Sequence, residues 1–131
     1  MARGQSLTAV VLVHLVINIA HGRAHAGARV PLPPAAALFV YIVILAGPLL
    51  ALVLSRWRPR AGGWLAAACM TGALVFGLVN HFIIDGLDHV AHVVPEWRSL
   101  FAVTAALLVI TEAAGVAIGI WSATGPERHR S

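Results

Sequence analysis

Histidines recur at regular spacing in two apolar parts of the chain. Six of the seven histidines belong to, or lie beside, two ladders of polar residues whose members are 4, 3 and 4 positions apart. The ladders are His14, Asn18, His21 and His25, and then His81, Asp85, Asp88 and His92. On an α-helix these steps stay within an arc of about 60°. Since imidazole nitrogens and carboxylate oxygens bind zinc, copper and iron, the spacing predicts two helices that each present one narrow stripe of metal ligands.

We expect the two stripes to face each other in two layers. The outer layer suits a tetrahedral Zn²⁺ ion, or a copper or iron ion with open coordination positions, and combines His21, His25, Asp88 and His92. The inner layer combines His14, Asn18, His81 and Asp85. About 10 Å of helix separates the layers. His89 is a candidate fifth outer ligand, or a hydrogen-bond partner that orients one.

Two other uses of the histidines stay open. In the first, a b-type haem for electron transfer takes its axial ligands from His14 and His81, or from His21 and His92. In the second, the polar residues form only a packing seam of interhelical hydrogen bonds, in a non-catalytic accessory subunit of a larger membrane complex. The metal hypothesis itself covers a redox or oxygenase metalloenzyme and a metal-handling protein.

Glu112 stands alone in the last apolar segment. An ionised carboxylate inside a membrane costs several kcal/mol unless it is paired or protonated. We expect Glu112 to be neutral, to accept a hydrogen bond from a ladder histidine, or to relay protons toward the site. Cys69 is the only cysteine, which excludes disulfide exchange of the CxxC type.

The arrangement resembles two known kinds of metal site, although no extended stretch of sequence carries the likeness. Paired ligands one turn apart on facing helices are similar to the intramembrane sites of zinc transporters, which implies transport. Layered histidines and carboxylates in a bundle resemble di-metal carboxylate proteins, which implies oxygen or redox chemistry. The chain lacks the Glu-x-x-His repeats that define the second kind.

The elements that must position these residues are transmembrane helices. Of the 131 residues, 60% are hydrophobic and only 11% are charged. Four apolar segments each approach the ~20 residues that cross a bilayer, and lipid leaves helices as the architecture that satisfies the backbone. The sequence predicts an all-α integral membrane protein, a single domain over 1–131, with helices near 6–28, 35–55, 62–93 and 99–122 and a polar tail at 123–131. An alternative for the first segment is a secretory signal peptide cleaved near Ala24-His25-Ala26.

Proline-rich turns divide the chain into two helical hairpins. The breaks fall at Pro31–Pro34, at Pro59 to Gly63 and at Pro95, and Pro48 predicts a kink in the second helix. The matching ladders predict a duplicated hairpin with a period of about 65 residues, whose halves are parallel and related by a pseudo-twofold axis along the membrane normal. Helices 1 and 3 would then meet at that axis.

Arginines set the expected orientation, because the chain has no lysine. Six favour one side (Arg3, Arg56, Arg58, Arg60, Arg128 and Arg130) against three on the other (Arg23, Arg29 and Arg98). The positive-inside rule therefore places both termini in the cytoplasm and the protein in the cytoplasmic membrane. We read the net charge of +4 as topology and lipid contact, not nucleic-acid binding. Expected partners are the lipid bilayer and either a second copy, met through Gly72, Gly77, Gly115 and Gly119, or a larger membrane complex.

Overall fold

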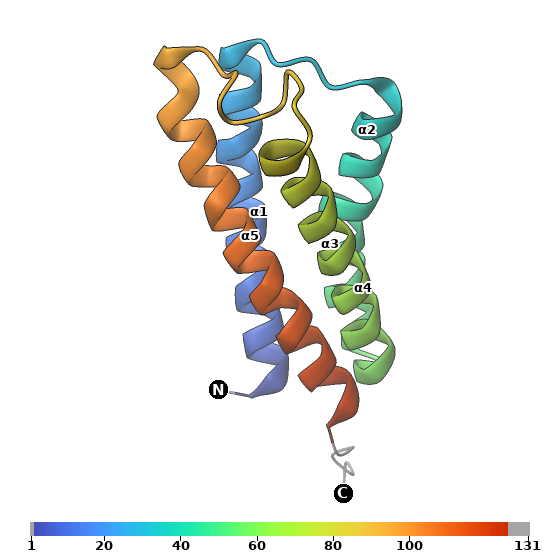
Figure 1. Cartoon of the computed structure of the whole chain (residues 1–131). Helices are drawn as coiled ribbons and strands as arrows, with labels where there is room; N and C mark the ends of the chain where they lie inside the picture. Colours follow the sequence, from blue (N-terminus) through green and yellow to red (C-terminus); the bar gives the residue numbers. More distant parts are fainter. Residues whose placement is uncertain (1, 126–131) are drawn as a thin grey trace, which may run out of the picture.

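Four helical spans run up and down through the computed structural model, which describes residues 2–125 (Figure 1). The first span is α1 (Arg3–Ala28). The second is continuous through α2 (Pro34–Phe39), the π-helix η1 (Val40–Ala46) and α3 (Gly47–Ser55). The third joins α4 (Pro59–Leu78) to the π-helix η2 (Val79–Ile83), and the fourth is α5 (Pro95–Thr124). All four are long and apolar enough to cross a membrane, and no strand occurs within residues 2–125. The prediction of an all-helical fold with four helices of membrane-spanning length and composition is confirmed.

Proline and one left-handed residue define where the spans begin and end. Pro34, Pro59 and Pro95 each occupy the first turn of a helix, where a missing N–H costs nothing. α1 ends at Arg29, whose φ of 56° turns the chain out of the helix. The next N–H, that of Val30, donates to the carbonyl oxygen of His25 at 3.1 Å. The last turn of α1, which carries His25, is therefore closed by backbone hydrogen bonds.

The third span is shorter than predicted, because its helix ends at Ile83 and not near residue 93. Ile84 is extended (φ −77°, ψ 125°), and Asp85 and Gly86 follow it, both weak helix formers. The loop over 84–94 then folds back, so that the Val90 N–H donates to the His81 carbonyl at 3.0 Å. The second ladder is consequently not a helical stripe: only its first member is helical, and this loop holds Asp85, Asp88, His89 and His92.

Two turns of the bundle are wound as π-helix. In η1 the Gly47 N–H bonds to the carbonyl of Ile42, five residues back, immediately before Pro48, which has no N–H to give. The expected disturbance at Pro48 therefore takes the form of a widened turn. In η2 the Ile84 N–H likewise bonds to the Val79 carbonyl, at 2.8 Å. Such turns are rare and often occur at functional sites.

The spans form a ring in which α5 packs against both α1 and α4, α3 packs against α4, and α1 and α4 lie on a diagonal (Figure 1). α4 and α5 approach each other closely, since a Cβ on Gly63 would lie 2.7 Å from the Gly119 carbonyl oxygen. The glycine faces of these helices are thus used inside the chain. The expectation that helices 1 and 3 meet holds for side chains, not for closely packed backbones.

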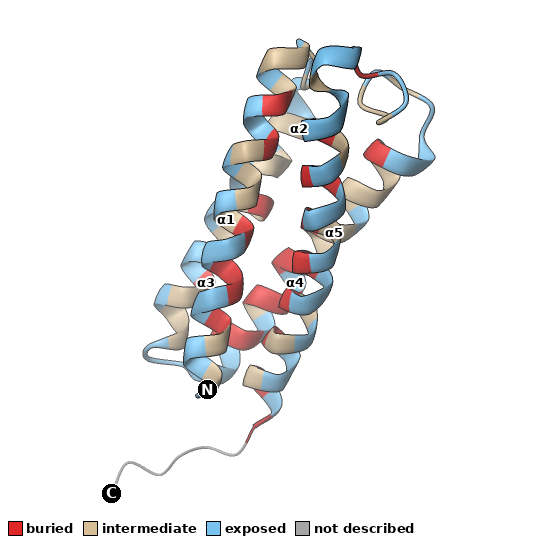
Figure 2. Cartoon of the chain, turned by 90° about the vertical axis from the view of Figure 1, so that its left-hand side faces the viewer, coloured by how far each residue is buried: buried red, intermediate tan, exposed pale blue. Residues whose placement is uncertain are grey.

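Buried residues lie mainly on the helix faces that are turned toward neighbouring spans (Figure 2). They include two apolar clusters. The cluster toward the chain termini includes Leu7, Val11 and Met70, and the cluster toward the loops is Ala24, Val93 and Phe101. Polar side chains are buried between them: His14, His21, His81, Thr104, Thr111 and Glu112. The fold therefore places a polar layer in the upper half of an otherwise apolar bundle.

Candidate metal centre

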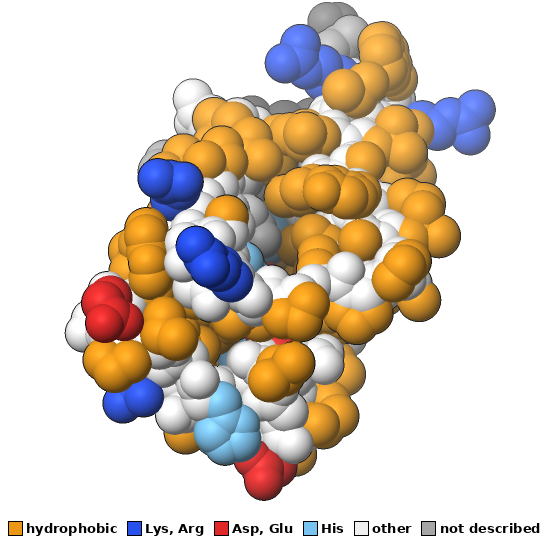
Figure 3. Space-filling model, turned by 90° about the horizontal axis from the view of Figure 1, so that it is seen from above, with side chains coloured by type: hydrophobic (Ala, Val, Ile, Leu, Met, Phe, Trp, Pro, Cys, Tyr) orange, Lys and Arg blue, Asp and Glu red, His pale blue; other side chains and the backbone are white. Residues whose placement is uncertain are grey.

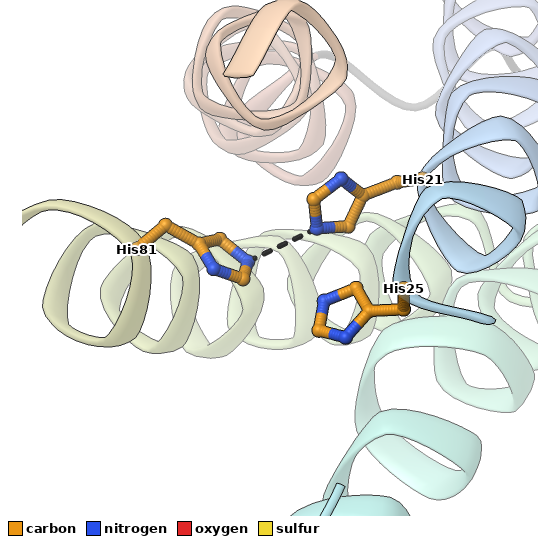
Figure 4. Close-up of side chains that lie close together, drawn as sticks. All are labelled: His21, His25 and His81. Atoms are coloured by element: carbon orange, nitrogen blue, oxygen red, sulfur yellow. Dashed lines mark hydrogen bonds between the residues drawn. The ribbon is translucent and has the colours of Figure 1, made fainter. Parts of the chain in front are cut away.

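Three histidines from two diagonal spans point toward one another near the loop end of the bundle (Figure 4). His21 and His25 lie one turn apart on α1, and His81 lies in η2. One ring nitrogen from each lies within 4.8 Å of the other two. His21 and His81 are buried, and the His25 side chain is 17% exposed. The predicted layers are not observed. His81 was expected in the inner layer, and it instead contacts His21 and His25 of the outer layer.

Phe101 supports this histidine cluster (His21, His25 and His81) from α5. Its ring is fully buried, and its centroid lies 4.7 Å from that of His21, 4.8 Å from that of His25 and 5.2 Å from that of His81. The aromatic side chain contacts all three imidazoles and limits how each can rotate. The cluster is therefore held in place on one side by a rigid apolar surface.

Hydrogen bonds determine which nitrogen of His21 carries the proton. The Thr104 hydroxyl lies 2.6 Å from the Leu100 carbonyl, to which it donates its one proton. It must therefore accept at the 2.8 Å contact with His21 Nδ1, which makes Nδ1 the protonated nitrogen. The Nε2 atom of a neutral His21 then keeps its lone pair and faces the cluster.

His81 is fixed in the same way. Its Nδ1 lies 3.1 Å from the carbonyl oxygen of Asp88, which can only accept. The Nε2 atom of a neutral His81 consequently also carries a lone pair, and it lies 3.1 Å from His21 Nε2. Two lone pairs repel at this distance, so the contact becomes favourable only when a proton or a metal ion lies between the two nitrogens.

The spacing suits a metal ion. Two imidazole nitrogens bound to one Zn²⁺ at about 2.05 Å, in tetrahedral geometry, are about 3.3 Å apart. The 3.1 Å separation of His21 Nε2 and His81 Nε2 is close to that value. His25 is a little farther away, and a small shift would bring it to a ligand distance. Three protein ligands would leave a fourth coordination position open, as in catalytic zinc sites.

Asp88 adds a carboxylate beside the cluster. Its Oδ1 lies 3.3 Å from His25 Nε2 and 3.3 Å from His81 Nδ1. This oxygen is buried, yet no hydrogen bond satisfies it. A carboxylate behind a metal-bound histidine is a common arrangement, because it orients the ring and makes the nitrogen a better ligand. Asp88 was predicted as a ligand, and the structure places its carboxylate next to two of the three histidines.

His14 and Glu112 form a separate buried pair deeper in the bundle. His14 Nε2 lies 3.3 Å from Glu112 Oε1, and the two side chains are 2% and 3% exposed. The expectation that Glu112 accepts a hydrogen bond from a ladder histidine agrees with this contact. Asn18 donates to the carbonyl of His14, one turn back on its own helix, at 2.9 Å. The predicted inner layer of His14, Asn18, His81 and Asp85 is therefore not assembled.

The remaining predicted ligands lie on the surface of the loop. His92 Nε2 contacts Asp85 Oδ1 at 3.1 Å, with side chains that are 46% and 87% exposed. His89 stacks loosely on His92, with ring centroids 5.6 Å apart. These residues do not join the histidine cluster, because the helix that was to carry them ends at Ile83. Neither predicted haem pair is brought together, since His14 faces Glu112, His81 faces His21, and His92 faces Asp85.

A cavity of about 330 Å³ continues from the histidine cluster into the bundle. His21, His25, His81 and Asp88 line its upper end, Glu112 its lower end, and mostly apolar side chains the wall between them. Seen from the loop end, the molecule is hollowed between hydrophobic side chains (Figure 3). The histidine cluster therefore borders a space large enough for a small molecule.

Comparison of the chain with protein-family models, with curated proteins and with solved structures gives no match.

Proposed function

We propose that this protein is an integral membrane protein whose histidine cluster binds one transition-metal ion. The observation that carries the proposal is the convergence of two lone pairs: Thr104 and the Asp88 backbone hold His21 and His81 so that both Nε2 atoms face the same point. Imidazole ligands suit zinc, copper, iron and nickel. The unsatisfied Asp88 oxygen supplies negative charge beside the cation.

The proposed role is that of a metal centre that acts on a small molecule. Structural zinc sites are closed by four protein ligands, whereas a site with three keeps a position for water or substrate. That position would border the cavity of about 330 Å³. A membrane metalloenzyme is therefore favoured over a metal-handling protein, for which we see no further ligand cluster along a path to the other end of the described bundle.

The proposal places the cluster near the extracytoplasmic face. Exposed apolar side chains such as Val16, Ile19 and Ile110 cover the outer surface and suit contact with lipid. The arginines at the end that holds the termini outnumber those at the loop end, which supports termini in the cytoplasm. Assembly with a second copy or in a larger membrane complex is a further proposal, which crosslinking in detergent and in lipid tests.

The duplicated hairpin also remains a proposal. The diagonal positions of the first and third spans are those that a pseudo-twofold axis requires. The ladders support it less than the spacing implied, because most of the second one lies in the loop over 84–94.

Metal analysis of the protein purified in detergent tests the proposed centre. After incubation with Zn²⁺ or Co²⁺ and removal of free metal, we expect about one ion per chain. His21→Ala and His81→Ala should abolish retention, and the matched control His92→Ala should leave it unchanged, because His92 is exposed and pairs with Asp85. Circular dichroism verifies that each variant remains helical.

Two outcomes would overturn the proposal. If the folded wild type retains none of Zn²⁺, Co²⁺, Cu²⁺ or Fe²⁺, the contact between His21 and His81 is a shared proton in a packing seam. A Soret band in the purified protein would instead identify haem, and the bis-histidine alternative would replace the three-histidine site.

A further inference from the structure

The lower end of the cavity holds a carboxylate with an unsatisfied oxygen. Glu112 is 2% exposed, and its Oε1 is paired with His14. Its Oε2 is buried and has no hydrogen-bond partner. Buried polar atoms are nearly always hydrogen-bonded, so an unpaired carboxylate oxygen beside a cavity indicates a missing donor.

Glycine keeps space free next to this oxygen. Gly77 lies on α4 opposite Glu112, and a Cβ at this position would be 3.9 Å from Glu112 Oε2 and 3.9 Å from His81 Cδ2. Both residues line the cavity. A group that enters from the cavity therefore meets Oε2 without displacing a side chain of α4.

The wall above Glu112 is apolar and reaches the outer surface of the bundle. It includes Ile44, Phe76 and Leu108, and the exposed residues Gly22 and Tyr41 mark where it opens between α1 and η1. Both π-helical turns, η1 and η2, contribute to this wall. In a membrane, this opening faces lipid, so a ligand that is soluble in the bilayer reaches the cavity directly.

We propose that the cavity binds a membrane-soluble alcohol or phenol, whose hydroxyl donates to Glu112 Oε2 and whose apolar body fills the space below the histidine cluster. The volume is about twice that of the ~150 Å³ cavity that accepts benzene, so two fused rings fit. A neutral hydroxyl supplies the missing donor without bringing a second charge out of water. The ligand site goes beyond the proposed metal centre and does not depend on it, because His14 and His21 are about 10 Å apart along α1.

Equilibrium dialysis of the detergent-solubilised protein tests this inference with two matched probes. 2-Naphthol carries the hydroxyl, and 2-methoxynaphthalene has the same rings without a donor. Protein-free micelles correct for partitioning into detergent. We expect saturable binding of one 2-naphthol per chain, and binding of the methyl ether about tenfold weaker, because the hydrogen bond to Glu112 Oε2 is lost.

Three variants connect binding to the cavity. Glu112→Gln keeps the shape and replaces the carboxyl group with an amide, whose NH₂ group cannot accept a hydrogen bond, and we expect it to weaken 2-naphthol binding about fivefold or more. Gly77→Leu fills the lower end of the cavity and should abolish binding. Gly4→Leu is the control, since a Cβ at Gly4 has nothing within 4 Å, and it should bind as wild type does.

Equal affinity for the two probes, or 2-naphthol binding that survives both Glu112→Gln and Gly77→Leu, would overturn the inference. Tighter binding of 2-naphthylmethylamine than of 2-naphthol would also overturn it, because the ligand would then be a cation. Each titration is repeated with EDTA and after Zn²⁺ loading. Failure of metal binding then appears in the metal analysis, and failure of the cavity site appears in the dialysis.

Discussion

At the scale of single residues, Thr104 and Asp88 decide what the histidines can do. In a neutral histidine either ring nitrogen can carry the proton, so each nitrogen can act as a hydrogen-bond donor or as an acceptor. Here Thr104 fixes the proton of His21 on Nδ1, and the Asp88 carbonyl does the same for His81. The Nε2 atoms of both histidines, which face the cluster, are thereby held as acceptors. A metal ligand needs this state.

Replacement of Thr104 by valine tests this argument. Thr104→Val keeps the shape and removes the acceptor for the His21 Nδ1 proton, so we expect Zn²⁺ affinity to fall about 10- to 100-fold. Competition with a chromophoric chelator measures the affinity. Thr111→Val is the matched control, because Thr111 is also buried on α5 and bonds only to the Leu107 carbonyl. Equal affinities of the two variants would show that Thr104 does not prepare His21.

Sequence reasoning recovered part of this site. The pairing of His21 with His25 follows from helical spacing alone. The contact of His81 with both, and of His14 with Glu112, depends on which spans are neighbours, and spacing within one helix carries no such information. Thr104 gave no signal, since a threonine in an apolar helix usually bonds to its own backbone, as Thr104 also does.

At the scale of elements, the predicted helices differ from the structure mainly at the end of the third span, which stops at Ile83. The four spans could be predicted from hydropathy, because length and apolar composition are sufficient. The end of the third could not be placed by periodicity, since the polar spacing of Asp85, Asp88 and His92 continues a helical pattern through the loop. The Asp85-Gly86 pair favours the end of a helix, but the helical spacing of the polar residues outweighed it in the prediction. The error matters chemically, because the loop brings Asp88 back over His81.

The contact between α4 and α5 leaves no room for added volume. A Cβ on Gly119 would lie 2.8 Å from the Ala67 nitrogen and 2.9 Å from the Gly63 oxygen, and these backbone atoms cannot move unless the helices separate. We expect Gly119→Ala to destabilise the bundle by about 1–3 kcal/mol and to lower the Tm by about 5 °C or more.

Thermal unfolding in detergent, followed by circular dichroism, measures the change in Tm. Gly22→Ala is the control in α1, because nothing lies within 4 Å of its Cβ. There the usual gain from replacing a helical glycine should leave Tm unchanged or raise it. A Gly119→Ala protein as stable as Gly22→Ala would contradict the close α4–α5 packing.

At the scale of the whole molecule, charge and aromatic residues mark two different ends. Arg3 lies over the Trp121 ring at 5.1 Å at the end that holds the termini, and Arg23 lies over the Trp97 ring at 5.8 Å at the loop end. Tryptophan at both ends suits two membrane interfaces. The predicted orientation also depends on Arg128 and Arg130, which lie outside the described residues, as does most of the predicted tail.

Labelling of single cysteines tests the span count and the orientation together. In a Cys69→Ala background, which removes the one buried thiol, Leu87→Cys places a thiol on the loop over 84–94, and Gly4→Cys places one at the opposite end. Leu87 is 69% exposed and Gly4 is also exposed, so both thiols are accessible once the reagent reaches them.

In intact cells, a membrane-impermeant maleimide should label Leu87→Cys and should label Gly4→Cys only after permeabilisation. The opposite pattern would reverse the orientation. Labelling of both positions without permeabilisation would place them on the same side of the membrane, and would contradict the three spans that separate them. Because the histidine cluster lies at the Leu87 end, the same result determines which compartment the cluster lies nearer to, and so from which side the proposed metal ion would enter.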